Sequence, residues 1–203
     1  MKLAVVVAAT LSVLAFHVNG ADAKENGIVR VGGEGRAVFV NTCGADTSVL
    51  KGALEKFENI AQVKFAIEPG TWKLSAAKKC YDDAKANIAV FIVNDEALPM
   101  SLIAMEAKWG VVNAQGLDAK CISKESLRVL AVLMGGASSR YPASVMQPVF
   151  SKEDLATKAG EVITFDAVMA FRSYCTALGI TPFQMMSRKD AEAEGLLPFE
   201  KEK

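Results

Sequence analysis

The chain has 203 residues, of which 51% are apolar and 23% are charged, a balance that is typical of a folded protein and excludes wholesale disorder. Basic and acidic residues number 23 each, so the net charge gives no reason to expect a nucleic-acid partner. Histidine occurs once, at position 17.

Residues 1–23 have the pattern of a secretory signal peptide. Lys2 precedes an apolar run, and the segment ends in an Ala-Asp-Ala sequence that is typical of a cleavage site. The run is shorter than the roughly 20 apolar residues that span a bilayer, and no later stretch reaches that length. We therefore expect export to the bacterial periplasm or the exterior, with no membrane span after cleavage.

Cleavage at this site would leave a mature chain without histidine. It would remove Lys2, His17 and Asp22, so that 22 basic and 22 acidic residues remain. Histidine is the commonest general base and the commonest metal ligand. Hydrolases with a Ser-His-Asp or Cys-His arrangement and zinc enzymes with imidazole ligands are therefore excluded, and we expect no cofactor.

The cysteine count is compatible with disulfides. An exported protein meets an oxidising compartment, and an even number of cysteines permits pairing, although the sequence does not choose among the three pairings. The spacing of the cysteines resembles no zinc motif. The four residues are Cys43, Cys80, Cys121 and Cys175.

The first half of the chain alternates between apolar segments and amphipathic segments. Residues 24–35 are polar and glycine-rich, which predicts a linker or an irregular start. Residues 87–93 are apolar nearly throughout, as in a strand that is covered on both faces. The pattern predicts strands at 36–41, 63–67, 87–93, 101–104 and 110–113, a helix from a cap at Asp46 or Thr47 to Ala61, and a helix at 72–86.

The second half is predicted to be helical. Residues 124–134, capped by Ser123, are apolar nearly all round, which indicates a buried helix that ends at Gly135-Gly136. A loop over 137–150 follows. Further helices are expected after caps at Ser151, at Thr164 or Asp166, and at Ser187. The expected fold is a single α+β domain over 36–203, with a mixed sheet and packed helices first and a helical half second.

Two Ser-x-x-Lys sequences could support nucleophilic catalysis without histidine. They place serine and lysine one helical turn apart, where a neutral lysine can take the serine proton. Exposed serine and lysine are also ordinary residues of amphipathic helices. The two pairs are Ser48 with Lys51 and Ser75 with Lys78.

Acidic pairs are a second source of chemistry. Paired carboxylates serve glycoside hydrolysis or bind hard cations, but adjacent acids are usually only solvated. The pairs are Asp82 with Asp83 and Asp95 with Glu96, and Glu106 lies near the second pair in the sequence.

One stretch, residues 127–146, resembles the active-site helix and methionine turn of the metzincin metalloproteases, in particular the archaemetzincins. In that family a helix carries H-E-x-x-H, a glycine ends it, a third histidine follows, and a Ser/Cys-Val-Met turn comes after. Matching Gly135 to the family glycine assigns the zinc-ligand positions to Arg128, Val132 and Ser138, the general-base position to Val129, and the turn to Ser144-Val145-Met146. Upstream, 88–95 and 109–114 resemble the paired edge-strand region of the family.

The resemblance implies a zincin-like fold without its chemistry. Valine and arginine do not replace imidazole ligands, Val129 cannot move a proton, and the charge of Arg128 opposes metal binding. It therefore implies no catalytic residue and no metal, and a cleft that holds a peptide along the edge strand near 109–113. The residues that we expect to retain a binding role are Ser138, Ser139, Arg140 and Tyr141.

Three functions remain open at this point. The first is a non-enzymatic pseudoenzyme or accessory protein that binds a peptide or another protein. The second is a histidine-free hydrolase with a Ser-Lys or carboxylate pair. The third is a structural envelope protein without a ligand cleft.

Overall fold

The computed structural model describes residues 27–73 and 86–197, which divide into two compact units. The larger unit comprises residues 32–184, and the smaller unit combines residues 27–31 with residues 185–197. The predicted signal peptide, most of the predicted helix at 72–86, and Cys80 lie outside the described residues. No helix of the described chain is long and apolar enough to cross a membrane.

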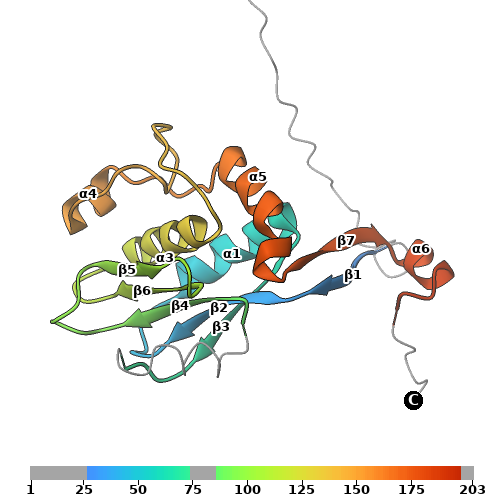
Figure 1. Ribbon diagram of the computed structural model, residues 1–203, viewed down its shortest axis with the longest axis horizontal. Coiled ribbons are helices and arrows are strands. Elements are labelled where there is room, and N and C mark those ends of the chain that lie inside the picture. The colour runs from blue at the N-terminus through green and yellow to red at the C-terminus, as the bar shows by residue number, and fades with distance from the viewer. Residues whose placement is uncertain (1–26, 74–85, 198–203) are drawn as a thin grey trace, which may run out of the picture. The chain divides into compact units, whose positions relative to one another are not determined.

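A five-stranded mixed sheet forms the centre of the larger unit (Figure 1), as predicted. The strands lie in the order β3-β2-β4-β6-β5. β2 (Arg36–Asn41), β3 (Lys64–Pro69), β4 (Ile88–Val93) and β6 (Trp109–Asn113) run parallel, and β5 (Ser101–Ala104) pairs antiparallel with β6. The two edge strands are therefore β3 and β5. The prediction of an edge strand at 109–113 was wrong: this segment lies inside the sheet between β4 and β5.

Strand β4 is buried along its whole length, which confirms that its continuous apolar run is covered on both faces. Alternate residues of a strand point to opposite faces. Ile88, Val90 and Ile92 join the core beneath the helices, and Ala89, Phe91 and Val93 join a second apolar cluster on the other face. Each face of the sheet thus carries an apolar cluster: helices cover the first face, and Trp72 packs against Phe91 on the second.

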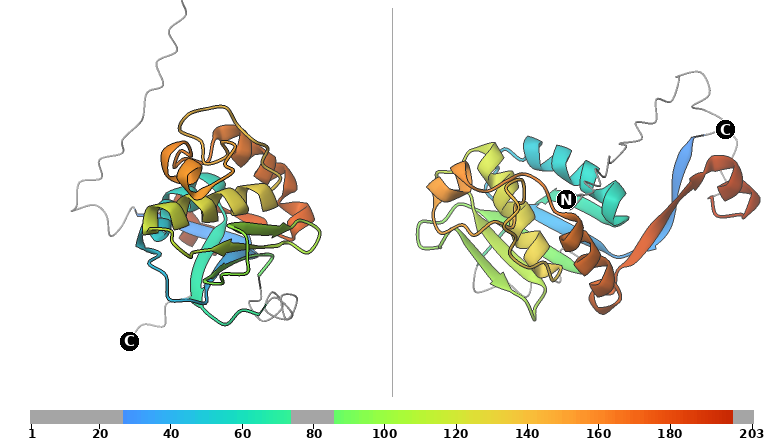
Figure 2. Two further views of the ribbon diagram at one scale, coloured as in Figure 1. Left: turned by 90° about the vertical axis from the view of Figure 1, so that its left-hand side faces the viewer. Right: turned by 90° about the horizontal axis from the view of Figure 1, so that it is seen from above.

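Three helices cover the first face of the sheet (Figures 1 and 2). They are α1 (Ser48–Ala61), α3 (Ala119–Leu133) and α5 (Phe165–Tyr174). The buried residues of α1 recur at the helical period, so one stripe enters the core while the opposite side meets solvent. The stripe consists of Leu50, Leu54, Phe57 and Ala61.

Helix α3 is longer than predicted at its beginning. It starts at Ala119, where the Asp118 carboxylate accepts a hydrogen bond from the Cys121 N–H at 2.7 Å, instead of at the predicted cap Ser123. Ser123 lies inside the helix and is 4% exposed. The prediction was wrong because aspartate and serine are both favoured at helix caps, so that the residue type alone does not choose between Asp118 and Ser123.

The predicted irregular start at 24–35 and the predicted C-terminal half both contain a strand that the sequence did not indicate. β1 (Ile28–Glu34) and β7 (Thr181–Ser187) pair in a two-stranded sheet. Glycines in β1 and Pro182 in β7 weaken the strand signal of both segments. β3 likewise continues to Pro69, past the predicted stop, because its position at the sheet edge tolerates proline.

The remaining helices begin where the sequence predicted. Ser151 and Ser187 accept hydrogen bonds from backbone N–H groups at the starts of α4 (Lys152–Thr157) and α6 (Arg188–Ala193). Thr164 directly precedes α5 (Phe165–Tyr174), and a short 3-10 turn follows at Thr176–Leu178.

Candidate functional site

The C-terminal end of α3 is fixed by two glycines. The Gly136 N–H donates to the Ala131 carbonyl at 2.8 Å, and the Gly135 N–H donates to the Val132 carbonyl at 2.9 Å. Gly135 has φ +82°, so this pair of bonds is a Schellman ending, in which a left-handed residue turns the chain out of the helix. The helix that carries Arg128 and Val132 therefore stops where the sequence predicted.

Arg128 is held by two neighbours on the α3–β5 side of the fold. Its Nε donates to a carboxylate oxygen of Glu125 at 2.8 Å, and a terminal nitrogen forms an ion pair with the other oxygen of that carboxylate. The same guanidinium donates to the Ser101 Oγ of β5 at 3.2 Å. Glu125 is fully buried and Arg128 is 20% exposed, so the pair joins the helix to the edge strand under partial cover from solvent.

The two valines at the positions that the resemblance assigns to the general base and a zinc ligand, Val129 and Val132, are packing residues. Val129 is fully buried, and α3 approaches β6 so closely there that a Cβ placed on Gly110 would lie 2.4 Å from Val129 Cγ1. Val132 lies one turn after Arg128, half-buried against the main core. Neither side chain carries an atom that can bind a metal or accept a proton.

The loop after α3 is closed at its base and exposed at its tip. The Ser139 N–H donates to the Met146 carbonyl at 2.9 Å, and Met146 itself is buried in the core. Ser144 is fully buried, accepts the Met146 N–H at 3.0 Å, and forms a parallel bridge with Val162.

The tip of this loop contains the residues that the sequence assigned to binding. Ser138, Arg140 and Tyr141 are exposed, and Ser139 is half-buried because its hydroxyl accepts the Tyr141 N–H at 3.2 Å. Tyr141 is 60% exposed, and its carbonyl accepts a hydrogen bond from the Gln147 side chain. The loop therefore presents a tyrosine ring on a backbone held by hydrogen bonds.

The residues at the three positions that the resemblance assigns to zinc ligands cannot form a zinc site. A zinc site takes three or four thiolate, imidazole or carboxylate donors in tetrahedral geometry. Arg128 supplies a permanent cation, Val132 supplies no donor atom, and Ser138 supplies only a hydroxyl. Over residues 27–73 and 86–197, no three His, Cys, Asp or Glu side chains gather in a group that could hold a metal ion.

The other candidates from the sequence lie apart from this segment. Ser48 lines a groove beside α3, whereas Lys51 lines a separate depression with Glu55 and Glu58. Asp95 accepts the Ala97 N–H at 2.9 Å in an exposed turn after β4. The pair Ser75 with Lys78 and the pair Asp82 with Asp83 lie outside the described residues.

The described cysteines form no disulfide with one another. Cys43 is exposed, whereas Cys121 and Cys175 are buried, and burial raises the pKa of both buried thiols. A raised pKa keeps these two thiols protonated and unreactive at neutral pH.

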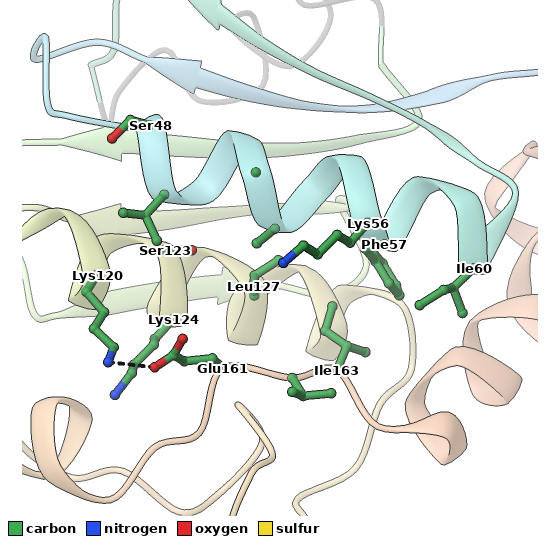
Figure 3. A pocket seen from close by; sticks show the side chains of 14 residues that line it. Ser48, Lys56, Phe57, Ile60, Lys120, Ser123, Lys124, Leu127, Glu161 and Ile163 are labelled. Atoms are coloured by element: carbon green, nitrogen blue, oxygen red, sulfur yellow. Dashed lines mark ion pairs between the residues drawn. The ribbon is translucent and has the colours of Figure 1, made fainter. Parts of the chain in front are cut away.

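A groove of about 480 Å³ opens between α1, α3 and the segment 161–163 (Figure 3). Its lining includes Ser123 and Leu127 of α3, but not Arg128, Val132 or the loop tip. The sequence did not predict this groove, because it arises where two helices and a loop that are distant in the chain meet. The three lysines among its lining residues offered no distinctive spacing.

An ion pair crosses one end of this groove. Lys120 of α3 contacts the Glu161 carboxylate at 2.6 Å. The carboxylate raises the pKa of Lys120, chiefly through that hydrogen bond, and the ammonium group lowers the pKa of Glu161 in return. Both side chains are more than half exposed, so solvent screens the pair.

Comparison with solved structures gives a match in fold. A zinc-dependent peptidase from Methanocorpusculum labreanum superposes with a TM-score of 0.51 and 9% sequence identity, over 66% of this chain and 99% of the peptidase chain. Archaemetzincin from Methanopyrus kandleri superposes over 70% of this chain and 96% of its own, with 11% identity and a TM-score of 0.49.

The likeness to the first of these structures concerns the fold alone. No family model matches the sequence, and a search of curated proteins gives no match. The chain therefore has a zincin-like α+β fold, as the resemblance of residues 127–146 implied.

Proposed function

We propose that this chain is an exported zincin-like protein without zinc-dependent catalysis, which binds a peptide or another protein in the bacterial periplasm or exterior. The observation that carries the proposal is the environment of Arg128. At the position that the metzincin resemblance assigns to a zinc ligand, a guanidinium is bound to Glu125 and Ser101.

Electrostatics and packing both support a loss of chemistry at this segment. Arginine stays protonated at any physiological pH, so it repels a dication instead of coordinating it. Val129, at the assigned general-base position, is buried against β6, where even a glutamate would be kept from solvent. Val129 and Val132 thus pack in or against the core, Arg128 is held in an ion pair, and Ser138 is exposed in the loop, which supports the absence of a metal site at these positions.

The edge strand and the loop tip support the binding half of the proposal. Among the described residues, β5 pairs with β6 alone, so its outer backbone groups have no strand partner there and could receive an extended peptide. Arg128 donates a hydrogen bond to Ser101 at the start of β5, so this part of α3 lies next to the β5 edge of the sheet. The exposed ring of Tyr141 offers an aromatic contact of the kind that dominates interfaces.

A metal titration tests the loss of zinc chemistry. The mature protein, dialysed against zinc and then against buffer, is expected to retain no stoichiometric zinc. A variant with Arg128→His, Val132→His and Ser138→His is expected to retain it. This variant also needs Glu125→Gln, because a buried carboxylate left without its partner would cost about 3–5 kcal/mol.

The matched control moves the third histidine from position 138 to position 140. If the compared positions converge, this control binds zinc at least about tenfold more weakly than the first variant. Stoichiometric zinc in the unmodified chain, removed by chelator with loss of the fold, would contradict the proposal. Equal zinc binding by the two histidine variants would show that the assigned positions are wrong.

Peptide binding is tested with a random peptide library panned against the mature protein. Peptides that bind are expected to lose about tenfold in affinity on Tyr141→Ala, because a central aromatic contact is worth about 1–2 kcal/mol. Phe150→Ala is the control, since Phe150 is also an exposed aromatic residue of the loop and is 87% exposed. Equal losses in both variants, or no selected peptide, would count against a binding role for the loop tip.

A further inference from the structure

The groove between α1, α3 and residues 161–163 has the size of a ligand site, and its lining shares only Leu127 with residues 127–146, the segment of the proposed function. Its volume of about 480 Å³ falls within the range of small-molecule pockets, roughly 300–1,000 Å³. All of its walls belong to the larger unit. A ligand bound in this groove would therefore be different from the peptide or protein of the proposed function.

The floor and rim of the groove are apolar. Phe57 and Leu127 form buried parts of the lining, and Ile163 faces them from the loop (Figure 3). The rim contains apolar side chains that are half exposed: Val49 at 43%, Ile60 at 56% and Val162 at 50%. Grouped apolar side chains left open to solvent indicate a surface that binds something.

A serine hydroxyl provides a polar contact inside the groove. Ser123 lines the groove, and its hydroxyl makes no hydrogen bond to another residue of the described chain. The residue as a whole is only 4% exposed, but its Oγ is not enclosed in the way that the Ser126 Oγ is. The Ser123 hydroxyl is therefore open to the groove, where it can donate a hydrogen bond to a ligand oxygen.

Two lysines of the groove have no ion-pair partner in the described chain, and only one of them, Lys56, also has an amine without a hydrogen-bond acceptor there. Lys120 is neutralised by Glu161, and the Lys124 amine donates to the Leu155 and Ala156 carbonyls, both at 3.2 Å. Lys56 has no ion-pair partner in the described chain, and Figure 3 shows its side chain extending from α1 over the groove. The residues three and four positions from Lys56 on its helix are Gly52, Ala53, Asn59 and Ile60, none of them acidic.

We infer that this groove binds a small amphiphile with an apolar tail and a single carboxylate. The tail lies on Phe57, Leu127 and Ile163, and the carboxylate lies within reach of the Lys56 amine and the Ser123 hydroxyl. The Lys56 amine is the lysine amine of the groove that no other described residue holds, so it can contact a carboxylate, and the open apolar rim selects a tail over a compact polar acid.

Calorimetric titration with octanoate tests this inference. We expect saturable binding of one octanoate per chain, and at least about tenfold weaker binding of 1-octanol, which has the same tail without the charge. Lys56→Met keeps the aliphatic stem and removes the charge, so it is expected to weaken octanoate by about tenfold as well. Lys51→Met, on another face of the same helix, is the control and should leave the affinity unchanged.

A second variant tests the position of the ligand. A Cβ on Gly52 meets no atom within 4 Å, and Gly52 lines the groove, so Gly52→Leu should fill the groove without disturbing α1. We expect it to abolish octanoate binding while the thermal midpoint stays equal or rises, since leucine favours a helix more than glycine does.

Several outcomes would overturn the inference. Absence of octanoate binding, unchanged affinity in both Lys56→Met and Gly52→Leu, or equal affinity for octanoate and 1-octanol would each do so. Sedimentation provides a further check: self-association that Gly52→Leu abolishes, without octanoate binding, would assign the groove to a second copy of the chain. Because the inference does not depend on the compared zinc positions, its failure would leave the proposed function untouched.

Discussion

Ser126 carries a buried hydroxyl that finds no hydrogen-bond partner in the described chain. Placing such a group in the interior costs free energy that no interaction offsets. We predict that Ser126→Ala raises the free energy of unfolding by about 1–2 kcal/mol, since alanine also favours a helix more than serine does. Urea denaturation of the two proteins measures the difference.

Ser144→Ala is the matched control for this prediction. Ser144 is also fully buried, but its hydroxyl accepts the Met146 N–H at 3.0 Å. The same substitution should therefore lower the free energy of unfolding by about 1–2 kcal/mol, because it leaves that N–H without a partner. A loss of stability in Ser126→Ala would mean that the Ser126 hydroxyl is satisfied in solution, for instance by water.

Residues 128–146 show what the sequence could and could not reveal about the site. The sequence indicated the buried helix, its glycine ending and the buried turn at Met146, because each depends on neighbours a few residues away. It did not reveal that Arg128 contacts Ser101, since those residues lie 27 positions apart and meet only through the sheet. The sequence did not reveal the groove either, because its lining residues come from segments that are far apart in the chain.

Helix α3 ends at a glycine that both conformation and packing require. Gly135 has φ +82°, and a Cβ there would lie 3.1 Å from the Tyr174 ring of α5. We predict that Gly135→Ala lowers the free energy of unfolding by more than about 1 kcal/mol, from backbone strain together with crowding. The thermal midpoint, followed by circular dichroism, is the measurement.

The same substitution in α1 should have the opposite sign. Gly52 lies inside a helix with open space around its Cα, so Gly52→Ala should raise the free energy of unfolding by about 0.5–1 kcal/mol. If both variants were destabilised, strain at Gly135 would not explain its effect. The pair thus separates helix propensity from the geometry of a helix end.

At the level of elements, prediction succeeded where a pattern is local and failed where packing decides. The five strands of the central sheet were predicted from short apolar segments that alternate along the chain with amphipathic helical segments. The caps at Ser151 and Ser187 were predicted from capping chemistry. The two strands β1 and β7 were missed because neither has a strong apolar pattern; each is a strand because it pairs with the other. The first turn of α3 was missed because Asp118 and Ser123 are both of a type that caps helices, and it is Asp118 that accepts the Cys121 N–H.

The acid response of the whole protein follows from carboxyl groups whose pKa is lowered by folding. Hydrogen bonds from backbone N–H groups at Ser48 and Cys121 lower the pKa of Asp46 and Asp118, and lysine partners lower the pKa of Asp154 and Glu161. A lowered pKa contributes stability above the unfolded values of 3.8 and 4.5, which is lost as the pH falls through the folded values. We predict that the urea midpoint falls as the pH drops below about 4.5.

Asp118→Asn isolates one part of this acid response. Asparagine caps a helix about as well as aspartate but does not titrate, so the variant should lose less stability than the unmodified chain over the same fall in pH. At high pH the sign is reversed. Lys120 has a raised pKa, so the stability that it contributes is lost only as the pH rises past 10.5. If the two proteins lost the same amount of stability on acidification, the contribution assigned to Asp118 would be contradicted.

The order of strands in the central sheet has a consequence for the chain during its synthesis. β2 is the first of the five strands to be made, yet it lies between β3 and β4, which come later in the chain. Its apolar stretch from Ala37 to Val40 therefore has two open edges until the ribosome has passed Pro69, and one open edge until it has passed Val93. During that interval a β-prone segment is free to pair with another chain, so the nascent protein needs shielding early, before most of its core exists.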